Sequence, residues 1–197
     1  ALLDDARAAR VVIVGTSLGG LLAMLFAARE PARVAGIVLN DIGPEIDPVG
    51  RTRIATYVVR SAPVRNWDEA VNQARATYGS ALPEFTDSEW LMLARRSYVE
   101  VDGVPRLDMD AMIGEAVRNP PSGSPQDLWP VFAALYPVPM LALRGELSDV
   151  LSAATLARME REHRGLRGVT VPRRGHPPLL DEPVSLAAID AFLSPLP

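Results

Sequence analysis

The chain has 197 residues, of which 48% are hydrophobic and 22% are charged, and this is the composition of an ordinary globular protein. Its formal net charge of −4 does not indicate a nucleic-acid partner, because nucleic-acid-binding surfaces carry clustered positive charge. The absence of cysteine excludes disulfides, thiol catalysis and thiolate metal sites.

The first predicted elements are the last turns of a helix at residues 2–9 and a strand at Val11–Val14. The strand is a continuous run of apolar, β-branched residues, which is typical of a strand buried on both faces of a parallel sheet. A tight turn at Gly15–Gly20 follows, and Leu18–Arg29 has the apolar spacing of a helix.

The long apolar run from Val11 to Ala28 is interrupted by this glycine-rich turn, so we expect no membrane span there. Residues 1–10 have no signal-peptide pattern. We therefore expect a cytoplasmic protein without a membrane partner.

Val34–Leu39 predicts a second buried strand, which completes a strand–helix–strand unit. A similar unit is predicted near the end of the chain. There, strands at Pro139–Leu143 and Gly168–Val171 alternate with helices at Ser152–His163 and Pro183–Leu193. This alternation predicts an α/β fold with a parallel sheet.

Residues 43–136 differ from the two core parts, 1–42 and 137–197, because Pro and Gly punctuate them and all three Trp residues fall among them. Short helical patterns fit residues 51–60, 67–78, 87–99 and 109–117. A mostly helical insertion between two halves of one sheet predicts a cap or lid over a site. Its aromatic side chains suit a small hydrophobic substrate group, although we expect most of them to form the core of the cap.

The segment Gly15-Thr16-Ser17-Leu18-Gly19 matches the pattern G-x-S-x-G between a predicted strand and a predicted helix. So sharp a turn strains its central residue and exposes the Ser17 hydroxyl as a nucleophile. The glycines two residues before and after Ser17 are expected to leave room for the neighbouring strand and helix. We expect the N–H of Leu18, at a helix N-terminus, to point at a developing oxyanion. The alternative interpretation is a glycine-rich turn that holds a serine by chance.

A serine nucleophile needs a base, and the chain has two histidines. His176 lies in a loop after the last predicted strand, at the carboxyl end of a parallel sheet, where such sites are built. His163 lies among charged residues at the end of a predicted helix, so we expect it at the surface. His176 is therefore the predicted base.

The base needs a carboxylate that orients its ring. Asp149 lies in the loop after the strand at Pro139–Leu143 and is the preferred candidate. Asp41 also follows a predicted strand, and Glu146 lies nearer to the end of its strand. Both remain alternatives, and any of the three carboxylates can equally serve as a loop residue that caps a helix.

The sequence around these candidates resembles the α/β-hydrolase fold family. GTSLGG resembles its nucleophile elbow, LNDIGP the start of its cap, RGELSDVLS its acid loop, and RRGHPPLLDEPVSLAAIDAFL its histidine loop and last helix. The order Ser17, Asp149, His176 is the order of this fold. The resemblance implies that Ser17 is the nucleophile, Asp149 the acid, His176 the base and Leu18 one oxyanion donor. We expect neither a metal nor a cofactor.

The resemblance covers the whole chain and is closest to a capped branch that includes ester hydrolases, enol-lactonases and C–C bond hydrolases. We therefore expect a serine hydrolase that acts on a small ester, lactone or related carbonyl compound through an acyl-enzyme. The alternatives are a C–C bond hydrolase or a cofactor-free peroxidase on the same triad, and a non-catalytic ligand-binding or interaction module with this fold. The set of Ser, His and acid argues against the last of these.

In the family, several strands and a loop with the second oxyanion donor precede the elbow, and residues 1–10 do not contain them. We expect the native molecule to contain that segment, upstream in a longer parent chain or as an associated piece. Without it, Val11–Val14 is expected to lie at an edge of the sheet with unpaired N–H and C=O groups.

Overall fold

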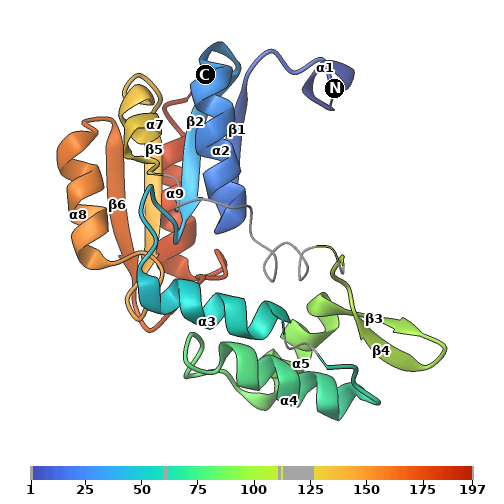
Figure 1. The fold of residues 1–197 in the computed structure, drawn as a ribbon. Coiled ribbons are helices and arrows are strands. Elements are labelled where there is room, and N and C mark those ends of the chain that lie inside the picture. The colour runs from blue at the N-terminus through green and yellow to red at the C-terminus, as the bar shows by residue number, and fades with distance from the viewer. Residues whose placement is uncertain (1, 60–61, 111, 113–126, 197) are drawn as a thin grey trace. The chain divides into compact units, whose positions relative to one another are not determined.

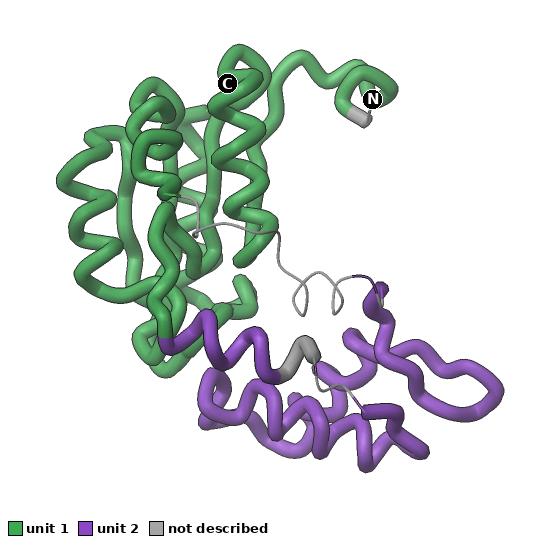
Figure 2. The backbone as a smooth tube through the Cα atoms, viewed as in Figure 1, with its two compact units in different colours: residues 1–48, 125–197 green, residues 49–124 purple. Residues whose placement is uncertain are grey.

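The computed structural model describes residues 2–59, 62–110, 112 and 127–196. The chain divides into two compact units (Figure 2). Unit 1 comprises residues 1–48 and 125–197, and unit 2 comprises residues 49–124. The expected insertion at 43–136 contains unit 2, but both of its ends belong to unit 1.

The centre of unit 1 is a four-stranded parallel sheet in the order β1-β2-β5-β6 (Figure 1). Its strands are β1 (Val11–Thr16), β2 (Val34–Asn40), β5 (Met140–Gly145) and β6 (Leu166–Val171). The predicted α/β fold with a parallel sheet is confirmed. Because the strands are parallel, their carboxyl ends all lie at the same end of the sheet, and the four loops that follow them start side by side.

Helices α2 (Leu18–Arg29), α8 (Ala153–Glu162) and α9 (Pro183–Leu193) pack against this sheet and cover both of its faces (Figure 1). Unit 1 also contains α1 (Leu2–Asp5), the short 3-10 helix η1 (Pro31–Arg33) and α7 (Trp129–Ala134). On one face, Ala188 of α9 packs with Val38 and Leu141 of the two central strands. On the other face, α2 lies so close that a Cβ at Gly20 would be 3.2 Å from Leu39 Cδ2. None of the helices in the described ranges has the length and apolar character required to cross a membrane.

β1 is an edge strand in the described part of the chain, where it pairs with β2 alone. Every residue of β2 is buried, whereas Val14 in β1 is 50% exposed. The exposed apolar surface continues onto α2, where Leu18 and Leu22 are 62% and 57% exposed. The prediction of a strand buried on both faces is therefore wrong for Val14, because β1 has a neighbouring strand on one side only. The prediction of an edge strand is confirmed.

The described part of unit 2 consists of α3 (Pro48–Val59), α4 (Trp67–Tyr78), α5 (Asp87–Ser97), β3 (Tyr98–Val101) and β4 (Val104–Leu107). Its core contains Ala70, Ala94 and Tyr98, with Trp67 packed against them. Trp90 is also buried, at 3% exposure, so these aromatic side chains form the core of the unit as predicted.

Two predictions for this unit have different outcomes. The helix predicted at 87–99 is too long. The helix α5 ends at Ser97, and from Tyr98 the chain forms the antiparallel hairpin of β3 and β4. The hairpin turns at Asp102 and Gly103, which have φ angles of 51° and 76° and so fit a tight two-residue turn. The helix predicted at 109–117 lies largely outside the described residues.

Candidate active site

Ser17 lies at the turn between β1 and α2. Its backbone angles are φ 50° and ψ −119°, a strained conformation for a residue other than glycine, as predicted. The Ser17 N–H donates to Asn40 O at 3.2 Å. The end of β2 therefore helps to hold the turn in this conformation.

Close packing requires two of the glycines around Ser17. A Cβ at Gly15 would lie 2.6 Å from Gly19 O, and a Cβ at Gly20 would lie 2.3 Å from Ile42 Cγ2. A Cβ at Gly19 would meet none of the described neighbouring atoms within 4 Å. The prediction that Gly19 leaves room for a neighbour is therefore wrong, and Gly20 has that role.

Ser17, His176 and Asp41 form one hydrogen-bonded row. Ser17 Oγ lies 3.0 Å from His176 Nε2, and Asp41 Oδ2 lies 2.8 Å from His176 Nδ1. His176 and Asp41 are 3% and 0% exposed, whereas Ser17 is half-buried. Because a carboxylate only accepts hydrogen bonds, Nδ1 carries the ring proton and Nε2 presents its lone pair to the Ser17 hydroxyl. A histidine in this arrangement is able to remove the proton of the serine.

The carboxylate that contacts His176 belongs to Asp41, so the assignment of Asp149 as the orienting acid is wrong. Asp149 follows β5, and the side chain from that loop that reaches Asp41 is Ser148, one residue earlier. The physical reason is the path of the loop that carries His176. This loop crosses the end of β5 and is tied to β2 by the hydrogen bond from Asn40 Nδ2 to Pro178 O, so His176 lies beside Asp41, the residue that follows β2.

Asp41 is fully buried and fully hydrogen-bonded. It directly follows β2 with φ 55°, a conformation that Asp tolerates better than most residues. The N–H of Gly145 donates to its Oδ1 at 2.8 Å, and the Ser148 hydroxyl donates to its Oδ2 at 2.5 Å. With His176, the carboxylate has three donors, and such complete pairing is what a buried charge requires.

The histidine loop, residues 172–182, passes directly over the end of β5. A Cβ at Gly145 would lie 2.5 Å from the carbonyl oxygens of both Arg174 and Gly175, so only glycine fits there. Glu146, the remaining candidate for the acid, accepts a hydrogen bond from the N–H of Arg173 at 2.8 Å. Glu146 therefore braces the histidine loop.

Asn40, which no sequence pattern singled out, ties the histidine loop to the sheet. Its side chain is buried, and Nδ2 donates to Pro178 O at 2.9 Å and to Thr16 Oγ1 at 3.1 Å. The signal for it was its place beside Asp41 at the carboxyl end of a buried strand.

Glu182 holds the other end of the histidine loop. It accepts hydrogen bonds from the N–H groups of Leu179 and Leu180, the hydroxyl of Ser185 and Nε of Arg174. Burial by itself raises the pKa of this carboxyl, but the hydrogen bonds, led by that of Leu179, outweigh burial and lower the pKa below its usual value.

Leu18 is the first residue of α2. The N–H groups of Gly20 and Leu21 donate to Ser17 O at 2.9 and 3.2 Å, whereas the earliest N–H groups of a helix have no acceptor within it. The Leu18 N–H therefore lies next to Ser17, where the sequence predicts an oxyanion donor, and its role stays a prediction.

His163 is 1% exposed, so its predicted surface location is wrong. Nε2 lies 2.9 Å from Leu135 O, and because a carbonyl only accepts, Nε2 carries the proton. The ring centroids of Phe132 and Tyr136 lie 5.4 and 6.0 Å from that of His163. His163 packs between α8 and the region of α7, away from the row of Ser17 and His176.

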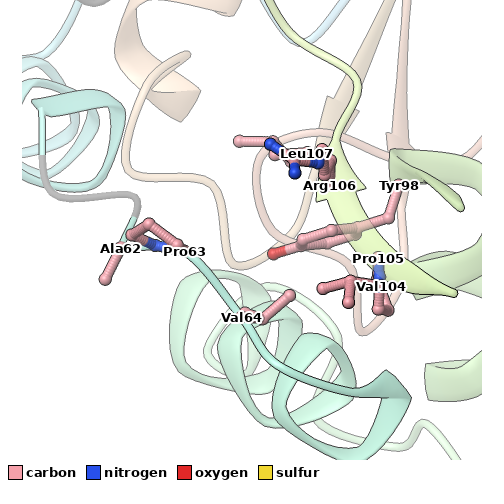
Figure 3. Close-up of a pocket in the computed structure, with 8 residues that line it drawn as sticks. All are labelled: Ala62, Pro63, Val64, Tyr98, Val104, Pro105, Arg106 and Leu107. Carbon is pink, nitrogen blue, oxygen red and sulfur yellow. The ribbon is translucent and has the colours of Figure 1, made fainter. Parts of the chain in front are cut away.

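Unit 2 contains a pocket of about 400 Å³ between the segment before α4 and the β3–β4 hairpin (Figure 3). It is lined by Ala62, Pro63, Val64, Tyr98, Val104, Pro105, Arg106 and Leu107. The Tyr98 hydroxyl donates to Gln73 Oε1, and Gln73 Nε2 donates to Ala62 O at 2.9 Å. Burial, and to a smaller extent Tyr78, raise the pKa of Tyr98 above its ordinary value.

Residues 1–189 match the family model described as alpha/beta hydrolase family. Among solved structures, an alpha/beta hydrolase from Novosphingobium aromaticivorans is 45% identical with a TM-score of 0.90, and the match covers 98% of this chain and 68% of that one. The structure of E-2-(acetamidomethylene)succinate hydrolase is 26% identical with a TM-score of 0.80, and the match covers 98% of this chain and 70% of that one.

Two curated relatives have named activities. The 3-hydroxybutyrate-oligomer hydrolase of Cupriavidus necator is 27% identical over 188 residues, which cover 91% of this chain and 64% of that protein. The 2-(acetamidomethylene)succinate hydrolase of Mesorhizobium japonicum is 28% identical over 166 residues, which cover 84% of this chain and 57% of that protein. The chain therefore spans less than two thirds of the length of either relative.

Proposed function

The chain belongs to the alpha/beta hydrolase family, and we propose that it carries the catalytic residues of a serine hydrolase acting on a small ester, lactone or related carbonyl compound. The observation that carries the proposal is the row of Ser17, His176 and Asp41, with contacts of 3.0 and 2.8 Å. In this proposal Ser17 is the nucleophile, His176 the base and Asp41 the acid that orients the base.

In the first half of the reaction, Ser17 Oγ attacks the carbonyl carbon of the substrate while His176 Nε2 takes the hydroxyl proton. The carbonyl oxygen becomes an oxyanion and accepts a hydrogen bond from the Leu18 N–H. His176 then gives its proton to the leaving alcohol oxygen, the bond from the carbonyl carbon to that oxygen breaks, and an acyl-enzyme remains on Ser17. Asp41 stabilises the imidazolium through Nδ1.

In the second half, a water molecule attacks the acyl carbon while His176 Nε2 takes a proton from the water. The second oxyanion collapses and the bond to Ser17 Oγ breaks. Ser17 recovers its proton from His176, and the carboxylic acid leaves. The net reaction consumes one water for each ester bond.

The relatives support the substrate class. The two curated relatives described above are hydrolases of 3-hydroxybutyrate oligomers and of 2-(acetamidomethylene)succinate. We propose that this chain likewise acts on a small molecule with a hydrolysable carbonyl group, and that unit 2, inserted in the sequence between β2 and β5, is its cap.

Reaction with a fluorophosphonate probe tests the proposal, because such probes react with an activated serine. We expect the label on Ser17, and we expect Ser17→Ala to lose both the label and ester turnover. Ser194→Ala, at an exposed position beyond α9, is the matched control and should keep both. Labelling that persists in Ser17→Ala, or that maps to another residue, would contradict the proposal.

We also propose that the expected additional segment covers β1 and α2 in the native molecule. Support comes from the exposed apolar side chains of Val14, Leu18 and Leu22 and from the greater length of the relatives. That segment would bring a second oxyanion donor, worth roughly 10²–10³ in rate. Comparing residues 1–197 alone with the longest native form, by ester turnover and by size in solution, tests this. A monomeric and fully active 1–197 would contradict it.

A further inference from the structure

Ser148 lies outside the proposed triad but touches its acid. Its hydroxyl lies 2.5 Å from Asp41 Oδ2, and this is the oxygen that faces His176 Nδ1 at 2.8 Å. The N–H groups of Val150 and Leu151 both donate to Ser148 Oγ at 3.1 Å. The Ser148 hydroxyl therefore has three partners, all within unit 1.

A count of protons and lone pairs fixes the direction of the Ser148 hydroxyl. A serine hydroxyl has one proton and two lone pairs. The two backbone N–H groups occupy the lone pairs, so the one proton points at Asp41 Oδ2, which as a carboxylate oxygen only accepts. The separation of 2.5 Å is typical of a charge-assisted O–H···O⁻ hydrogen bond.

We infer that Ser148 is a positioning residue that holds the Asp41 carboxylate with Oδ2 towards His176. The bond from Cβ to Cγ of an aspartate has a broad torsional minimum, so packing alone defines the carboxylate plane poorly. The N–H of Gly145 fixes Oδ1 and the Ser148 hydroxyl fixes Oδ2. Because Asp41 is fully buried, its carboxylate depends on these protein donors for its hydrogen bonds. The inference rests on the proposed function.

The test uses Ser148→Ala in the longest native form of the protein that contains residues 1–197. Loss of a hydrogen bond to a charged group predicts a kcat roughly ten- to a hundredfold lower, with KM little changed. The rate of fluorophosphonate labelling at Ser17 should fall by a similar factor. Ser152→Ala is the matched control from the same loop, because Ser152 caps α8 by accepting from Thr155 N–H at 3.0 Å. It should lower thermal stability and leave kcat unchanged.

A second readout does not depend on substrate. The hydrogen-bonded Nδ1–H of His176 is expected to give a downfield proton resonance, which Ser148→Ala should shift and Ser152→Ala should not. Ser148→Cys, which keeps a side chain of similar shape but has a much weaker donor, should also lower kcat, and it replaces Ser148→Ala if that variant does not fold. A native kcat in whichever of these variants folds, with the resonance unmoved, would overturn the inference. A native protein that neither takes the probe nor turns over esters would instead overturn the proposed function.

Discussion

Replacing Asp41 by Asn distinguishes most sharply between the two assignments of the acid. The carboxylate accepts from the N–H of Gly145 through Oδ1, and from the Ser148 hydroxyl and His176 Nδ1 through Oδ2. An amide has one oxygen and one NH₂ group, so Asp41→Asn has to present N–H groups at one of these two positions. The two possible orientations have different costs.

With the amide oxygen towards His176, the new NH₂ group faces the N–H of Gly145 at about 2.8 Å, so the Gly145 N–H and both amide N–H groups lack acceptors. With the oxygen towards Gly145, the Ser148 hydroxyl and one amide N–H lack acceptors, which is one donor fewer. Each unsatisfied buried donor costs about 1–3 kcal/mol, so the second orientation is favoured by about that amount. In it, the amide donates to His176 Nδ1, the ring proton moves to Nε2, and His176 no longer accepts the proton of Ser17.

We therefore expect Asp41→Asn to lower kcat by about 10⁴, the loss caused by the same wrong tautomer in serine proteases, with KM little changed. At about 1.36 kcal/mol per factor of ten, this is about 5.4 kcal/mol of transition-state stabilisation. The assay is turnover of a chromogenic short-chain ester, together with the rate of fluorophosphonate labelling at Ser17. Asp149→Asn is the matched control and should leave both near native. The reasoning is refuted if Asp149→Asn is the damaging change and Asp41→Asn is benign.

Two further predictions concern stability. Gly20→Ala should lower the free energy of unfolding by about 1–3 kcal/mol, because its Cβ would lie 2.3 Å from Ile42 Cγ2, whereas Gly19→Ala meets no such clash and should be neutral or stabilising by up to about 1 kcal/mol. Denaturant unfolding measures both, and equal effects of the two substitutions would contradict the packing argument. The lowered pKa of Glu182 means that its stabilising effect is present above its ordinary value of 4.5 and is lost as pH falls through the folded-state value. Glu182→Gln should therefore be less stable than native at neutral pH and lose less stability on acidification, and a parallel pH dependence of the two proteins would argue against this role.

The elements that the sequence predicted best are those with local signals. The β-branched run at Val11–Val14 lies in β1, the apolar segment Val34–Leu39 lies in β2, and the glycine pattern lies at the turn between β1 and α2. A run of β-branched residues disfavours a helix, and a strained turn needs glycines nearby, so each prediction depends on a few neighbouring residues. For the same reason, the sequence located Ser17 correctly without any information about its partners.

The prediction that His163 lies at the surface was wrong because it was based on the charged residues beside His163. The spacing of the buried residues along the helix indicated the opposite. Leu156, Met159 and His163 are spaced by three and four residues, so they lie on one face of α8, and all three are buried. The charged residues between them face away from the core. The hairpin of β3 and β4 was not predicted, because the helical pattern of α5 was extended through Tyr98. The pair Asp102-Gly103 is a common signal for a hairpin turn and marks its position.

The acid was misassigned because its choice depends on how the histidine loop crosses the sheet, which is a property of the tertiary structure. Asp41 and Asp149 both lie between Ser17 and His176 in the sequence, so chain order fits either of them. In the structure, the loop passes over Gly145 at the end of β5 and is tied to β2 by the hydrogen bond from Asn40 to Pro178.

This crossing places His176 beside the residue that follows β2. The loop after β5 does not supply the carboxylate that contacts His176. It supplies the Ser148 hydroxyl, which donates to that carboxylate. Each of the four adjacent strands is thus followed by one member of a single hydrogen-bonded row: Ser17, Asp41, Ser148 and His176. A pattern read along the chain identifies Ser17 and His176, whereas Asp41 and Ser148, which continue the row beyond His176, are defined only when the path of the histidine loop over the sheet is known.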